Sequence, residues 1–203
     1  MVKYQRKFIR LKDYDYSQAG GYFITICVHN HRMLLQPSPV QNMIKRWWDK
    51  LPQRFHEVEI DQFVIMPNHI HGVILIVGAD PRVCPNPVVG ADPRVCPNHN
   101  DKGEHMGSPL QNIHPSLSDI IQWFKTMTTN EYIHYVNQND WLQFETRFWQ
   151  RNYYEHIIRD ESELNRICEY IINNPVKWQF DRENTDRIPD QQYEQEWQWL
   201  EGY

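Results

Sequence analysis

The sequence lacks long hydrophobic runs and closely spaced cysteines. No apolar stretch approaches the roughly 20 residues that a membrane-spanning helix needs, so we expect no membrane span. The basic residues 1–7 are followed by no apolar signal core, and we therefore expect no secretory signal peptide. The four cysteines are scattered without a Cys-x-x-Cys motif, which argues against a zinc ribbon. These absences favour a cytoplasmic protein with reduced thiols.

The composition is that of a folded domain with unevenly distributed charge. Hydrophobic residues make up 40% of the 203 residues and aromatic residues 13%, which is enough to bury a core. The net charge is −5, and residues 181–203 alone hold seven acidic residues against two arginines. The first twelve residues hold no acid and five basic residues: Lys3, Arg6, Lys7, Arg10 and Lys12. A basic arm suits phosphate binding, although ordinary solvated charge explains each cluster equally well.

Two histidines open a hydrophobic run directly after a Pro67-Asn68 turn signal. Side chains alternate along a strand, so His69 and His71 should share one face while Ile70 points to the other. Two imidazoles on one face are a natural pair of metal ligands. A chance pattern is the competing interpretation, because the chain contains ten histidines.

A second His-x-His pair follows the first predicted strand. His29 and His31 flank Asn30 and precede Arg32, which suggests an exposed loop. We rank this pair below the first one, although it could help to contact phosphate.

Hydrophobic periodicity predicts alternating strands and helices. Ser116 and Asp160 are expected to cap two of the helices, and Pro175 should end the last helix near Asn174. Strands are expected over residues 22–28, 58–65, 69–77 and 155–158, and helices over residues 40–55, 116–136 and 160–174. The second and third strands should form an antiparallel hairpin, since only a short turn separates them.

Residues 78–107 interrupt this pattern. The nine-residue sequence GADPRVCPN occurs at residues 78–86 and again at residues 90–98. A short perfect repeat rich in proline and glycine cannot form a packed element by itself, so we interpret it as a flexible insertion. A metal knuckle formed by Cys84 and Cys96 is a weaker alternative.

Three segments, in this order, resemble the REP-associated tyrosine transposases, relatives of the small single-tyrosine HUH transposases of bacterial insertion sequences. They are MPNHIH at residues 66–71, WQRNYYEHIIR at residues 149–159 and EYIINNPVK at residues 169–177. The resemblance implies one HUH transposase domain over residues 1–178, followed by an acidic tail over residues 179–203. The implied fold is α+β, a ferredoxin-like antiparallel sheet with helices packed on one face.

The same resemblance implies a catalytic site. His69 and His71 correspond to the metal ligands, Tyr170 to the nucleophile and Asn174 to a third ligand, and the expected ion is Mg²⁺ or Mn²⁺. The tyrosine would attack a DNA phosphorus and leave a 5′-phosphotyrosine link with a free 3′-OH. Tyr153 and Tyr154 are rival nucleophiles, but they precede a strand and no amide follows one helical turn later.

The implied substrate is single-stranded or hairpin DNA with palindromic repeats. Relatives include dimers with shared sites and forms that act as monomers, so a homodimer stays open. Basic residues would contact phosphates and tyrosines would stack on bases. The candidate DNA-binding residues are Lys3, Arg6, Lys7, Arg10, Lys125, Arg151, Tyr153 and Tyr154. A domesticated protein that binds repeat hairpins without cutting them is the main alternative, and a metal-dependent hydrolase of small molecules is a third.

Overall fold

The structure is a computed structural model that describes residues 14–77, 115–138 and 140–201. Several sequence predictions lie outside these residues. They concern the repeat insertion at residues 78–107 and the basic residues Lys3, Arg6, Lys7 and Arg10. Within the described ranges, no helix is long and apolar enough to cross a membrane.

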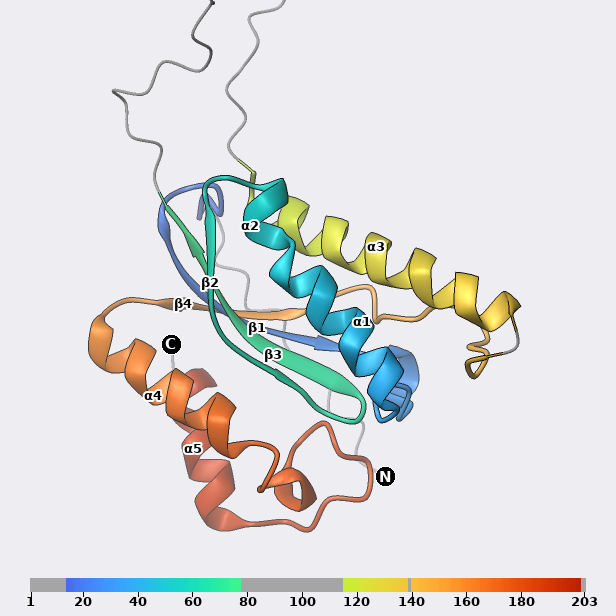
Figure 1. Cartoon of the computed structure of the whole chain (residues 1–203). Helices are drawn as coiled ribbons and strands as arrows, with labels where there is room; N and C mark the ends of the chain where they lie inside the picture. The colour runs from blue at the N-terminus through green and yellow to red at the C-terminus, as the bar shows by residue number, and fades with distance from the viewer. Residues whose placement is uncertain (1–13, 78–114, 139, 202–203) are drawn as a thin grey trace, which may run out of the picture.

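A four-stranded antiparallel sheet forms the centre of the molecule (Figure 1). The strands are β1 (Gly20–Cys27), β2 (Val58–Ile65), β3 (His69–Ile76) and β4 (Tyr154–Ile158). Their order in the sheet is β2-β3-β1-β4, and all neighbours run antiparallel. This strand order, with one helical crossover before β2 and another before β4, confirms the predicted ferredoxin-like α+β fold.

Helices cover both faces of this sheet (Figure 1). On one face lie α1 (Ser38–Asp49), α2 (Leu51–Arg54) and α3 (Leu117–Asn137). On the other face lie α4 (Glu161–Asn173) and α5 (Gln191–Glu201), and two short 3-10 helices, η1 (His29–His31) and η2 (Trp178–Phe180), lie in connecting segments. The expected layer of helices on one face is therefore joined by a second layer on the opposite face.

Local sequence signals explain the helix boundaries. Ser116 forms a capping box with Asp119 at the start of α3, and the Asp160 side chain accepts a hydrogen bond from the Glu163 backbone N–H at the start of α4. The helix predicted over residues 40–55 is divided at Lys50, because Pro52 fits the first turn of α2 better than a helix interior.

Two hydrophobic cores lie on opposite faces of the sheet. The larger core, toward α1 and α3, contains Ile70 and Ile74 of β3. The smaller core, toward α4 and α5, contains Val73 of β3 and Phe23 of β1. The alternation of side chains along β3 thus supplies both cores, and it places His69 and His71 on the side of the smaller one.

The Trp48 ring occupies the space where a side chain at position 72 would lie. An added Cβ on Gly72 would approach the Trp48 ring to 2.5 Å, and that ring is stacked on Phe63 with centroids 4.4 Å apart. We expect Gly72→Ala to lower the free energy of unfolding by about 1–3 kcal/mol, because the packed ring has to move. Urea denaturation measures the change.

Gly20→Ala is the matched control, because its added Cβ would meet the Tyr22 hydroxyl at an ordinary 3.5 Å. Equal effects of the two substitutions would show that the contact with Trp48 is not the cause.

Candidate functional site

The two histidines of β3 lie side by side beneath α4 and α5. Both side chains are fully buried, and their Nε2 atoms are 2.9 Å apart. The Nδ1 atom of His69 lies 2.8 Å from Oδ1 of Asn68, and the Nδ1 atom of His71 lies 2.9 Å from Oγ1 of Thr25. These partners fix both ring orientations, as outer-shell contacts do for metal-ligating histidines. The shared face predicted for the pair is confirmed.

Asp181 brings a carboxylate to the same place. Its Oδ2 atom lies 3.8 Å from Nε2 of His69, and Asp181 is fully buried. One donor atom from each of His69, His71 and Asp181 lies within 4.8 Å of the other two. The sequence analysis did not identify Asp181, because it lies in an acid-rich segment without a motif.

The donor spacing fits a divalent cation. Neighbouring ligands of an octahedral ion at about 2.1 Å are about 3.0 Å apart, whereas tetrahedral ligands at that distance are about 3.4 Å apart. The 2.9 Å between the two Nε2 atoms is close to the octahedral value, whereas the 3.8 Å from Nε2 of His69 to Oδ2 of Asp181 is wider than either value. Two unprotonated Nε2 atoms at this distance would also repel one another unless a proton or a cation lies between them.

Tyr170 reaches the histidines from α4. Its hydroxyl lies 3.4 Å from Nε2 of His71 and 3.1 Å from the hydroxyl of Tyr193, which in turn donates a hydrogen bond of 2.9 Å to Oδ2 of Asp181. Burial raises the pKa of Tyr170 well above its usual value, and Tyr193 and Asp181 add to this effect. In this closed arrangement Tyr170 is a neutral phenol, and the Tyr193 hydroxyl links it to Asp181.

Asn174, the predicted third ligand, lies one helical turn after Tyr170. It is fully buried at the C-terminal end of α4, and neither polar atom of its side chain makes a hydrogen bond of normal geometry to the described residues. Contact with Asn174 slightly opposes the rise in the pKa of Tyr170. An unsatisfied buried amide beside Tyr170 is consistent with a ligand or a bound group there. Its role as a metal ligand stays a prediction.

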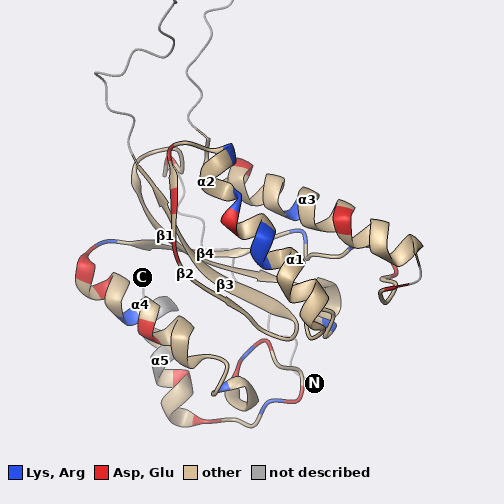
Figure 2. Cartoon of the chain, viewed as in Figure 1, with Lys and Arg blue, Asp and Glu red and all other residues tan. Residues whose placement is uncertain are grey.

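The C-terminal segment closes this site. Tyr193 and Trp197 of α5 are buried in the smaller core, and the ring centroids of Trp197 and Tyr170 are 5.4 Å apart. Acidic and basic residues are interspersed along the chain between α4 and α5 (Figure 2). Residues 179–203 were treated as a tail in the sequence analysis, although the spacing of Tyr193 and Trp197 after Asp190 is a helical signal.

Three of the predicted DNA-binding residues gather elsewhere, in a groove beside α3. Lys125, Arg151 and Tyr153 all line this groove. The Lys125 ammonium donates hydrogen bonds to the backbone carbonyls of residues 150, 151 and 152, and burial lowers the pKa of Lys125 to about 8. Its proposed contact with phosphate stays a prediction, because the ammonium group already binds the backbone of this loop.

Tyr154 lies on the other face of the sheet from this groove. Its ring centroid is 6.2 Å from that of Phe23 and 6.0 Å from that of Trp197. Tyr154 therefore packs in the core around Tyr170, whereas Tyr153 faces α3, where its hydroxyl lies 3.4 Å from Oγ of Ser118.

Comparison with known proteins gives two sequence relatives and several similar solved structures. A Haemophilus influenzae protein of uncharacterised function is 36% identical over 187 residues, which cover 88% of this chain and 93% of the relative. A second Haemophilus influenzae protein, named "Putative REP-associated tyrosine transposase", is 37% identical over 60 residues, 28% of this chain and 34% of that protein. A solved REP-associated tyrosine transposase bound to a REP hairpin is 19% identical with a TM-score of 0.48, covering 88% of this chain and 74% of the other. Protein-family models gave no match.

Asn68 connects the histidine pair to the C-terminal segment. Its Nδ2 atom donates to the backbone carbonyls of Glu183 at 2.6 Å and His31 at 3.3 Å, while Oδ1 faces His69. We expect Asn68→Ala to lower the free energy of unfolding by at least about 2 kcal/mol, because buried polar partners are left unsatisfied.

Urea denaturation of the full chain measures this effect. Asn152→Ala at an exposed position serves as the control, with an expected change within about 0.5 kcal/mol. If the two variants were equally stable, Asn68 would not be the connection described above.

Proposed function

The chain belongs to the same family as the Haemophilus influenzae protein that it matches over nearly its full length, and we propose that it is a metal-dependent tyrosine transposase. It would cleave and rejoin single-stranded or hairpin DNA. The convergence of Tyr170 with His69 and His71 in one buried site carries this proposal. The three motif segments and the name of the second relative support it.

The residues of the site fit Mg²⁺ or Mn²⁺. His69, His71 and Asp181 would hold the ion, and Asn174 would add an amide oxygen. When bound, the ion polarises the scissile phosphate. The carboxylate and amide oxygens suit both ions, and the two imidazoles suit Mn²⁺ better than Mg²⁺.

Tyr170 is the proposed nucleophile. A bond forms between its phenolic oxygen and the phosphorus, and the bond from phosphorus to the 3′ oxygen breaks, which leaves a 5′-phosphotyrosine and a 3′-OH. The phenolic proton is released to water as this bond forms, and the departing 3′ oxygen takes up a proton from water. Asp181 and Tyr193 hold the Tyr170 hydroxyl only in the closed arrangement, before the segment that carries them moves. Attack by a 3′-OH on the phosphotyrosine reverses these steps and rejoins the DNA.

In this proposal Tyr170 acts beside His71 of its own chain. A homodimer stays a prediction. Because Asp181 is fully buried in contact with His69, the segment that carries it has to move before a DNA phosphate can enter.

The same burial favours a second candidate function. Tyr170 is 7% exposed and both histidines are fully covered. A protein that keeps this face closed would bind repeat hairpins through other surfaces and leave the DNA uncut.

Removing the Tyr170 hydroxyl separates the two candidates. We expect wild-type protein with Mg²⁺ or Mn²⁺ to form a denaturant-resistant adduct with labelled single-stranded DNA that carries a palindromic hairpin from the gene's flanks. Tyr170→Phe keeps the ring packing but removes the attacking oxygen, so the adduct should vanish while DNA binding persists. Gel electrophoresis under denaturing conditions measures the adduct.

Tyr153→Phe is the matched control and should retain the adduct, because Tyr153 lies near α3 rather than near the histidines. An adduct that survives Tyr170→Phe would reject Tyr170 as the nucleophile. Tight binding without any adduct from the wild type would favour the hairpin binder.

The contribution of each proposed metal ligand can be measured as the change in Mn²⁺ affinity when that residue is substituted. We expect Asp181→Asn to weaken Mn²⁺ binding by about tenfold or more, because it removes the negatively charged donor beside His69. Titration calorimetry or electron paramagnetic resonance measures the affinity, with Asp186→Asn at an exposed position as the control. Asn174→Ala tests the ligand that the resemblance implies, and unchanged affinity in Asp181→Asn would remove Asp181 from the ligand set.

A further inference from the structure

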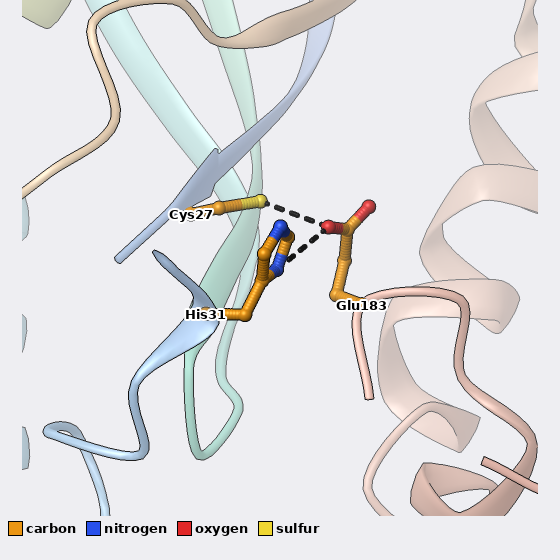
Figure 3. Close-up of side chains that lie close together, drawn as sticks. All are labelled: Cys27, His31 and Glu183. Carbon is orange, nitrogen blue, oxygen red and sulfur yellow. Dashed lines mark hydrogen bonds and ion pairs between the residues drawn. The ribbon is translucent and has the colours of Figure 1, made fainter. Parts of the chain in front are cut away.

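A second cluster of metal-ligating side chains lies where β1 ends (Figure 3). Cys27 is the last residue of β1, His31 follows in η1, and Glu183 comes from the segment between η2 and α5. The Cys27 thiol donates to Oε2 of Glu183 at 3.3 Å, and Nδ1 of His31 lies 3.3 Å from the same oxygen. One donor atom of each residue lies within 4.8 Å of the other two.

The three side chains differ in their access to solvent. Cys27 is 2% exposed and Glu183 is 5% exposed, whereas His31 is 33% exposed. The thiol and the carboxylate are therefore withdrawn from bulk water. Nδ1 of His31, the ring atom that faces them, is buried as well, although the rest of the imidazole reaches solvent.

Two of the three donor separations are close to those of tetrahedral coordination, and the third, between sulfur and nitrogen, is below 4.8 Å. With the usual zinc bond lengths, a nitrogen and an oxygen ligand are about 3.3 Å apart, and a sulfur ligand is about 3.6 Å from either of them. The observed separations of 3.3 Å for nitrogen and oxygen and 3.3 Å for sulfur and oxygen are close to these values. We propose that Cys27, His31 and Glu183 form a second metal site, which binds zinc or a similar thiophilic divalent ion with water as the fourth ligand.

The backbone holds His31 in place for this role. Asn30 and His31 both have left-handed conformations, with φ of 56° and 52°, which are uncommon for residues other than glycine. The turn is anchored by hydrogen bonds from the His29 N–H to the Phe148 carbonyl and from the His31 N–H to the Val28 carbonyl. The turn therefore directs the His31 ring back toward the end of β1.

Gln150 supplies an outer-shell partner for the imidazole. Its side-chain amide lies 2.9 Å from Nε2 of His31. The 2.9 Å contact joins the amide nitrogen to the ring, and nitrogen and oxygen of an amide can be exchanged by a 180° flip. With the oxygen facing the ring, it accepts a hydrogen bond from the Nε2–H group, which leaves Nδ1 as the metal ligand. Metal uptake releases the Cys27 thiol proton and forms a sulfur–metal bond.

This site differs chemically from the one around His69 and His71. It contains a thiol, which favours zinc and similar ions, whereas the first site offers only nitrogen and oxygen donors. The inference does not rest on the proposed transposase function, because it concerns metal binding alone. Cys27 and His69 are nevertheless neighbours across the β1–β3 register.

Cobalt spectroscopy tests the proposal directly. Reduced, metal-stripped full-length protein is titrated with Co²⁺, and a thiolate-to-cobalt charge-transfer band should appear in the near ultraviolet and disappear when Zn²⁺ is added. Cys27→Ser should lose the band. Cys168→Ser is the matched control and should keep it, because Cys168 lies on α4 away from the cluster.

Two further variants show which of the two sites binds the cobalt and whether a lost signal reflects loss of the fold. Glu183→Gln preserves the side-chain shape and should weaken Zn²⁺ binding by about tenfold or more, with circular dichroism reporting the fold. His69→Ala should retain the cobalt band. The proposal is overturned if wild-type protein gives no thiolate band, if the band persists in Cys27→Ser, or if a Cys84→Ser/Cys96→Ser variant abolishes it.

Discussion

The antiparallel register between β1 and β3 is the constraint on which both candidate sites depend. It pairs Thr25 with His71 and Cys27 with His69, and it places the histidines on the face toward α4. A shift by one residue would turn both imidazoles into the core beneath α1 and α3 and bring Ile70 to the site. The large core on one face of the sheet therefore fixes the position of the polar site on the other face.

In the site around His69 and His71, polar groups that are costly to bury receive hydrogen-bond partners from the C-terminal segment that covers them. Buried imidazoles and a buried carboxylate are tolerated when each has a polar partner, and Asp181 provides one for His69 while Tyr193 provides one for Asp181. On the proposed function, a DNA phosphate carries the same sign of charge as Asp181. Phosphate oxygens can therefore replace the carboxylate beside the histidines when the C-terminal segment withdraws, with little change in local charge.

Periodicity and capping signals predicted most of the fold because they depend on neighbouring residues. The strand at residues 155–158 is confirmed, the shared face of the histidines is confirmed, and the helix ending near Asn174 is confirmed. Asp181 and Glu183 were not predicted as site residues. Their contacts with His69 and Cys27 join positions more than 100 residues apart, and they form only because the segment after Trp178 folds back onto the sheet. No local sequence pattern predicts that this segment folds back onto the sheet. The helical spacing of apolar residues in α5, in contrast, was present in the sequence.

The two candidate sites lie on the same side of the sheet, and hydrogen bonds also connect them. Asp181 and Glu183 are separated by one residue, and the Glu183 backbone N–H donates to Oδ1 of Asp181 at 2.7 Å. Asn68 adds a second link, since its side chain contacts both His69 and the Glu183 carbonyl. A metal held by Cys27, His31 and Glu183 would thus restrain the segment that carries Asp181. On these two proposals, binding at one position would stabilise the closed arrangement at the other. The two sites would then be coupled in free energy, and the coupling would be reciprocal.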